Sequence, residues 1–161
     1  MKKSPSALVL LLTAALGGCG GSVVRLRVDS ASNVNGQRSV YVLVRTVQEA
    51  DFRMESYDEV AAKVVHPDDS VQDMAVALPG VPVSFALKGP LKGRVAIYAL
   101  FERPVCGAWR VLLPKEAPSQ AELRLGDGKL CLVDERGECV AQSCGLGAGV
   151  ATMDPESEPE R

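Results

Sequence analysis

Strict alternation of apolar and polar residues recurs along this sequence and limits the folds open to it. In residues 81–87, the large apolar residues Val81, Val83, Phe85 and Leu87 alternate with Pro82, Ser84 and Ala86. A period of two places one face of a strand in a core. Strand-like segments are expected at 23–29, 39–47, 71–78, 81–87, 94–101, 108–113, 120–125 and 129–133. Short strands in this number, with frequent turns, predict an all-β fold in which two sheets form a β-sandwich.

Turn sequences separate these segments. Asn35-Gly36, Pro79-Gly80, Gly89-Pro90 and Gly126-Asp127-Gly128 supply positive or fixed φ values. Their spacing agrees with the short connections of a sandwich.

A single helical insertion is expected at about residues 55–65. Ser56 and Glu59 have the spacing of a capping box. The apolar residues that follow recur at helical spacing and can lie on the sandwich. These are Tyr57, Val60, Ala61 and Val64. Pro67 predicts the end of the helix, because the residue before a proline is pushed out of the α region.

The amino terminus has the pattern of a bacterial lipoprotein signal. Lys2 and Lys3 precede an apolar stretch over residues 7–16 that is too short to span a bilayer, and Leu16-Gly17-Gly18-Cys19 follows. This run resembles the lipobox, in which the cysteine is acylated and becomes the first residue after cleavage. The sequence therefore predicts a signal peptide over 1–18 and lipidation at Cys19. An ordinary secretory signal with an incidental cysteine is the alternative.

Acylation would fix the domain close to a membrane. Only residues 20–22 separate Cys19 from the first strand, a tether of about 10 Å. Gly20 stands where inner-membrane lipoproteins typically carry Asp, which favours the periplasmic face of the outer membrane. The predicted organisation is a lipidated tether over 19–22, a sandwich over 23–144 and a disordered acidic tail over 145–161.

Charge and hydropathy argue against nucleic acid as a partner and against a second membrane anchor. Without Lys2 and Lys3, 16 of the 18 basic residues stand against 20 acidic ones, a formal charge of −4, with no basic cluster in the sequence of the mature part. Nucleic acid is therefore not an expected partner. No second apolar run is long enough to cross a bilayer, so the lipid is the expected anchor.

Four cysteines fall in the mature domain: Cys106, Cys131, Cys139 and Cys144. Thiols pair in an oxidising periplasm, so two disulfides are expected, with three possible connectivities. Cys131 and Cys139 flank the turn sequence 134–137, which could bring them together. A zinc site is the alternative, although no C-x₂-C pair is present and His66 lies far away in sequence.

Catalytic motifs are scarce. His66 is the single histidine, and its place before a proline indicates an exposed turn. The sequence contains no G-x-S-x-G, no H-E-x-x-H and no Gly-rich phosphate loop. Asp68-Asp69-Ser70 and Asp127-Gly128 could ligate Ca²⁺ but read better as turns. We therefore expect no enzyme activity, metal, cofactor or small-molecule substrate. The segment 30–38 is longer than a tight hairpin needs, which suits either recognition or a passive connection.

The order of the segments that follow the lipobox resembles that in TssJ, the outer-membrane lipoprotein family of the type VI secretion system. The resemblance lies in an Asn-containing loop and strand at 33–45, in Phe52 and 56–60, in the turn Leu78-Pro79-Gly80, in the strand 95–101 and in Trp109-Arg110. The four cysteines of the domain, the acidic tail and Thr46-Val47 depart from the family pattern.

The resemblance implies a transthyretin-like β-sandwich with an added helical piece, bound to the outer membrane through acyl chains. It also implies a partner, the periplasmic C-terminal domain of the inner-membrane protein TssM. In the family the loop between the first two strands contributes to that contact. The corresponding residues here are Asn33, Val34, Asn35, Gly36, Gln37 and Arg38. The alternative is a periplasmic ligand-binding or assembly-factor lipoprotein of another envelope machine, which would need a deep apolar pocket.

Overall fold

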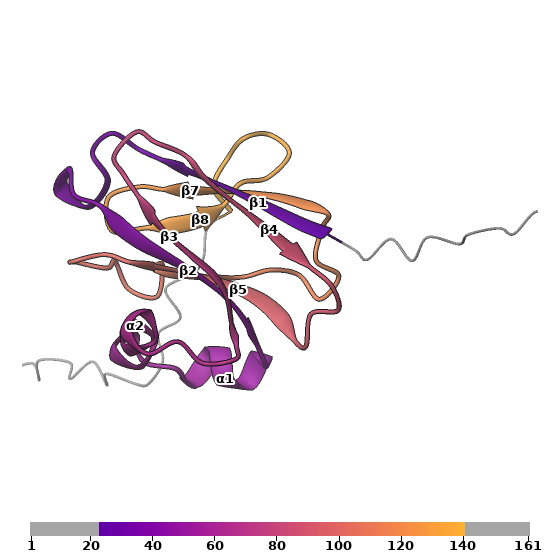
Figure 1. Ribbon diagram of the computed structural model, residues 1–161. Helices are drawn as coiled ribbons and strands as arrows, with labels where there is room; N and C mark the ends of the chain where they lie inside the picture. Colours follow the sequence, from indigo (N-terminus) through magenta and orange to yellow (C-terminus); the bar gives the residue numbers. More distant parts are fainter. Residues whose placement is uncertain (1–22, 141–161) are drawn as a thin grey trace, which may run out of the picture.

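The computed structural model describes residues 23–140, and its strands form two four-stranded sheets that pack face to face (Figure 1). The first sheet has the order β4 (Val83–Lys88), β1 (Val23–Ser30), β7 (Gln120–Leu125) and β8 (Leu130–Leu132). The second has the order β3 (Val71–Ala77), β2 (Val40–Val47), β5 (Arg94–Leu100) and β6 (Arg110–Leu112). The predicted signal peptide, Cys19, Cys144 and the predicted acidic tail lie outside the described residues.

The predicted all-β sandwich is confirmed, and each expected segment contains a strand. β1 pairs in parallel with β7 and antiparallel with β4, whereas the pairs of the second sheet are all antiparallel. β4 starts at Val83 rather than Val81, because the Val81 N–H donates to the Leu78 carbonyl and makes a turn. The prediction failed there because alternation alone does not distinguish a strand from the turn before it.

A single apolar core fills the space between the sheets. The inward side chains come from alternate positions of the strands, as the period-two pattern requires. Fully or almost fully buried examples are Leu26, Val28, Val42, Val44, Val95, Ile97, Val111, Leu123 and Leu125.

The prediction of one helical insertion was incomplete, since two helices connect β2 and β3. α2 (Tyr57–Val65) has the predicted capping box between Ser56 and Glu59 and ends at His66. α1 (Glu49–Met54) was missed because it is only six residues long and follows the N-cap residue Gln48, whose side chain makes no cap hydrogen bond. Among residues 23–140 no helix is long and apolar enough to cross a bilayer.

Both helices lie on the outer face of the second sheet (Figure 1). The Tyr57 ring meets the Trp109 ring edge-on at 5.0 Å between centroids, and Val60 is fully buried. Because core covers one face of β2 and the helices cover part of the other, most of this strand is buried.

The strand directions give the sandwich two ends. At the loop end, Ser30 pairs with Leu125 and Tyr41 pairs with Leu100, so the β1–β2, β5–β6 and β7–β8 connections meet there, with the β3–β4 turn beside them. At the N-terminal end lie Val23 and the β4–β5 and β6–β7 connections, and the helical β2–β3 connection leaves from the same end. One strand length, about 25 Å, separates the two ends (Figure 1).

Candidate functional site

The β1–β2 connection at the loop end has a defined backbone. A single 3₁₀ turn, η1 (Val34–Gly36), forms its centre. Asn35, Gly36 and Gln37 have φ values of 48°, 63° and 64°, three consecutive residues in the left-handed region. Asn and Gly adopt this region most readily, which explains the Asn-Gly pair at this point of the sequence.

Val34 and Asn35 hold this loop against the sandwich. Val34 is fully buried and Asn35 is 9% exposed. The Asn35 Oδ1 accepts from the Glu102 N–H at 2.8 Å, and its Nδ2 donates to the Ser39 carbonyl at 3.2 Å. These two buried side chains therefore hold the loop in position, and the partner contact of residues 33–38 stays a prediction. An asparagine in a loop sequence gives no signal of burial.

Asn33, Gly36, Gln37 and Arg38 remain exposed on this loop. Arg38 forms an ion pair with Glu102 of the β5–β6 connection, and both side chains are more than half exposed. The hydrogen bond to Glu102 and the charge of that carboxylate raise the pKa of Arg38 above its usual value. Screening by water leaves such a pair little effect on stability, so Arg38 can exchange Glu102 for another carboxylate.

Exposed apolar side chains surround this loop. The Gly80 N–H donates to the Ala31 carbonyl at 3.3 Å and ties the β3–β4 turn to it. On that turn Leu78 and Val81 are 52% and 48% exposed, and Val105 of the β5–β6 connection is 38% exposed. Apolar side chains grouped beside a polar rim are typical of a protein interaction site.

The same apolar surface continues along the outer face of the second sheet. Tyr41 of β2 pairs with Val76 of the edge strand β3, and both side chains are exposed. Met74 lies two residues before Val76 on the same face. Together with Leu78 they form an apolar stripe that leads to the loop end.

A cleft of about 450 Å³ opens between the connections of the loop end. Its lining is mostly polar or charged: Asn35, Gly36, Arg38, Glu102, Arg103, Val105 and Asp127. The close approach of the β7–β8 turn fixes one wall, because a Cβ at Gly128 would lie 2.5 Å from the Arg103 carbonyl oxygen. Mixed charges in an open cleft suit a protein surface better than the deep apolar pocket that a small apolar ligand needs.

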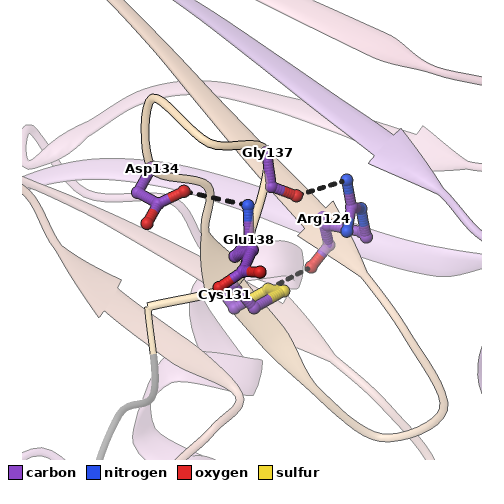
Figure 2. Close-up of a disulfide and its surroundings, with 6 residues drawn as sticks. Arg124, Cys131, Asp134, Gly137 and Glu138 are labelled. Atoms are coloured by element: carbon purple, nitrogen blue, oxygen red, sulfur yellow. Dashed lines mark hydrogen bonds between the residues drawn. A yellow bond between two sulfur atoms is a disulfide. The ribbon is translucent and has the colours of Figure 1, made fainter.

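Cys131 and Cys139 form a disulfide, one of the pairings that the sequence left open, with 5.4 Å between their Cα atoms. Figure 2 shows how the intervening turn closes: the Asp134 carboxylate accepts from the Glu138 N–H at 2.9 Å. The disulfide joins β8 to the returning chain, one residue after the start of β8 at the loop end. Cys106 lies on the β5–β6 connection, and the second disulfide stays a prediction because Cys144 is outside the described residues.

A polar cluster beneath the helices has a structural role. The Arg45 Nη1 lies 2.7 Å from the Glu55 Oε1, and both side chains are largely buried. The Tyr98 hydroxyl donates to the other oxygen of Glu55 at 2.7 Å. Burial and the Glu55 carboxylate raise the pKa of Tyr98 far above its usual value. These bonds hold the helical insertion on the sheet.

Metal ligation finds no support within residues 23–140, where no group of three His, Cys, Asp or Glu side chains could hold an ion. His66 is exposed at the end of α2. Asp68 accepts from the Ser70 N–H at 3.0 Å and pairs with Lys63, which agrees with the interpretation of 68–70 as a turn.

Comparison with known proteins finds one matching family and several solved structures with a similar fold. Residues 41–125 match the family of the IglE N-terminal domain. A comparison with curated proteins finds no match. Among solved structures, Serratia marcescens Lip, described as a membrane-bound component of the type VI secretion system, has a TM-score of 0.60 and 20% identity over 71% of this chain and 98% of its own.

Two further structures agree with it. The type VI lipoprotein TssJ1 from Pseudomonas aeruginosa has a TM-score of 0.54 and 16% identity over 70% of this chain and 95% of its own. A chain in the structure described as the TssM C-terminal domain (869–1107) from EAEC gives 0.57 and 16% over 70% and 98%. At these identities the likeness establishes a shared fold, and with the family match it confirms the predicted resemblance to TssJ.

Proposed function

The chain belongs to the family of the IglE N-terminal domain, and from this premise we propose that it is an outer-membrane lipoprotein that tethers the membrane complex of a type VI secretion system. Residues 1–18 act as the signal peptide, and the acylated Cys19 inserts into the periplasmic face of the outer membrane. The sandwich then serves as a rigid attachment point for the complex and catalyses no reaction.

The observation that carries this proposal is the opposition of the two ends of the sandwich. Val23, four positions after Cys19, starts β1 at the N-terminal end. The β1–β2 connection and the exposed apolar residues lie at the other end, about 25 Å away. An anchor at one end and an interaction surface at the other are what a tether requires.

The proposed partner is the periplasmic C-terminal domain of a TssM-like inner-membrane protein. Arg38 and Gln37 of the β1–β2 connection, with Leu78 and Val81 of the β3–β4 turn, would meet it. Support comes from exposure: these side chains offer a charge and apolar surface on a backbone that Asn35 already holds in place. A preformed loop loses less conformational entropy on binding.

The test is capture of the mature chain by a TssM-like periplasmic domain, combined with flotation of the acylated chain on membranes. Cys19→Ser should abolish flotation and secretion while the soluble domain is still captured. Arg38→Glu should weaken capture without changing flotation, and Lys92→Glu, an exposed charge reversal at the other end, is the matched control. Full secretion by Cys19→Ser would contradict the anchoring role. Equal capture of the wild type, Arg38→Glu and Lys92→Glu would mean that the partner does not bind at the loop end.

A further inference from the structure

Three exposed lysines surround the start of β1. Lys88 pairs in register with Val23, the first residue of that strand. Lys92 lies on the β4–β5 connection and Lys115 on the β6–β7 connection, and both connections border one cleft beside Val23. Residues far apart in the sequence thus form one group, the N-terminal lysine ring, defined as Lys88, Lys92 and Lys115.

The charges of this ring are not neutralised by the sandwich itself. Within residues 23–140 none of the three lysines forms an ion pair, whereas Arg94 nearby is paired with Glu49 at 2.6 Å. Glu116 is the single acidic residue in the two connections. The described residues as a whole carry no excess of positive charge, so the ring is a local concentration.

We propose that the N-terminal lysine ring rests on anionic phospholipid headgroups of the membrane that holds the anchor. This inference depends on acylation of Cys19 as proposed above. A tether of three residues limits the distance from the membrane to about 10 Å, close to the Debye length of about 8 Å at physiological ionic strength. The lysines therefore lie within the range at which headgroup charges act on them.

Charge on the flank of the molecule selects the same orientation. Acidic side chains gather on the side of the second sheet: Asp58 and Glu59 on α2, Asp68 and Asp69 just before β3, and Asp73 within β3. Since β3 begins opposite Arg45, near the end of β2, Asp68 and Asp69 lie toward the N-terminal end but on the second sheet, whereas Lys88 lies on the first. An anionic surface attracts the lysine ring and repels the acidic side, so the sandwich stands on its N-terminal end with the second sheet tilted away from the membrane and the loop end pointing toward a partner that spans the periplasm.

Amine labelling of the acylated full-length chain in vesicles tests the contact. The described residues contain five lysines, and Lys129 at the loop end serves as an internal control. In vesicles of phosphatidylethanolamine and phosphatidylglycerol, labelling of the three ring lysines should fall about fivefold relative to detergent, the factor that corresponds to ~1 kcal/mol for each lysine near an anionic surface. Labelling of Lys129 should not change.

Two comparisons separate charge from simple proximity. In phosphatidylcholine vesicles, or at a salt concentration of about 1 M where the Debye length is about 3 Å, the protection should disappear. In the variant with Lys88→Gln, Lys92→Gln and Lys115→Gln, hydrogen exchange of the two connections should be equally fast in anionic vesicles and in detergent, although the protein still floats.

Each other result overturns the inference. Flotation with unprotected ring lysines overturns the lipid contact and leaves the anchor intact. Equal protection in neutral vesicles overturns recognition by charge. A chain that does not float with vesicles at all overturns the anchor and this contact together.

Discussion

The loop end and the N-terminal end of the sandwich are built from connections of the same strands, yet they present opposite chemistry. The loop end has exposed Leu78, Val81 and Val105, and the buried Asn35 side chain fixes its backbone. The N-terminal end has the three ring lysines, none of which forms an ion pair within residues 23–140. The difference agrees with the proposals that one end binds a specific protein and that the other rests on a membrane surface without fixed shape.

The two kinds of chemistry differ in what they demand of the backbone. Apolar contacts stabilise a complex only when water is excluded, so they require a fixed shape. Attraction between lysines and headgroups acts over several ångströms and requires only density of charge. At the loop end, two hydrogen bonds of the Asn35 side chain give the backbone such a fixed shape. Within residues 23–140, the side chains of Lys88, Lys92 and Lys115 make no comparable hydrogen bonds.

The largest expected effect is a loss of partner affinity in a variant that changes only the loop end. Leu78→Asp with Val81→Asp should weaken capture by the TssM-like domain about 100-fold, because each apolar side chain contributes about 1.5 kcal/mol when buried. Both residues are exposed, so the free energy of unfolding should change little. Titration of the labelled partner measures the affinity, and vesicle flotation should be unchanged.

The matched control for this double variant is Met54→Asp. Met54 is 84% exposed on α1, away from the loop end. Affinity equal to that of the wild type is expected for the control. A similar loss in both proteins would mean that the apolar surface at the loop end has no special role.

Sequence patterns predicted the strands because period-two alternation and turn residues are local signals. The capping box of Ser56 and Glu59 is local as well, and α2 was predicted for that reason. α1 lacks a cap and is held by contacts distant in sequence, such as the ion pair of Glu49 with Arg94. A helix that depends on tertiary contacts has no signature of its own.

The N-terminal lysine ring and the hydrogen bond of Asn35 to Glu102 could not be predicted from the sequence, because each joins residues that are distant along the chain. Lys88, Lys92 and Lys115 are separated along the chain, and only the pairing of β1 with β4 brings Lys88 to Val23. The sequence therefore shows no basic cluster, although the folded domain has one. The predicted β1–β2 loop was correctly located in the fold, but its division into buried and exposed residues depends on Glu102, which is 67 positions away from Asn35.

The next effect concerns the disulfide-linked hairpin on the edge strand β8, beside the loop end, and should change neither of the proposed contacts. Cys131→Ser with Cys139→Ser removes a bond across a separation of 8 residues. The lost constraint on the unfolded chain should lower the free energy of unfolding by roughly 2 to 3 kcal/mol. Urea denaturation measures the loss, while capture and flotation of the folded variant should equal those of the wild type. A variant that no longer binds would place this hairpin in the partner contact.

A smaller effect sharpens the distinction between brace and contact within the β1–β2 connection. Asn35→Ala leaves the Glu102 N–H and the Ser39 carbonyl without their partner and puts Ala at a left-handed φ. We expect a loss of about 2 kcal/mol in the free energy of unfolding, with weaker capture as a consequence. Asn33→Ala, an exposed neighbour, should leave stability unchanged. Equal stability of both variants would contradict the role of Asn35 as a brace.

The smallest effect involves the flank between the two ends and appears as a function of pH. The pKa of Tyr98 is raised in the folded state by burial and by Glu55, whereas an unfolded tyrosine titrates near about 10. The folded state therefore holds its proton more tightly, and this contribution is complete below about pH 10 and is lost as the pH rises above that value. The free energy of unfolding, measured by urea denaturation between neutral pH and about pH 11, should fall more steeply for the wild type than for Tyr98→Phe. Parallel curves would mean that Tyr98 ionises as easily folded as unfolded, and that the helical insertion is held on the sheet mainly by the Arg45–Glu55 pair and the aromatic contacts of Tyr57.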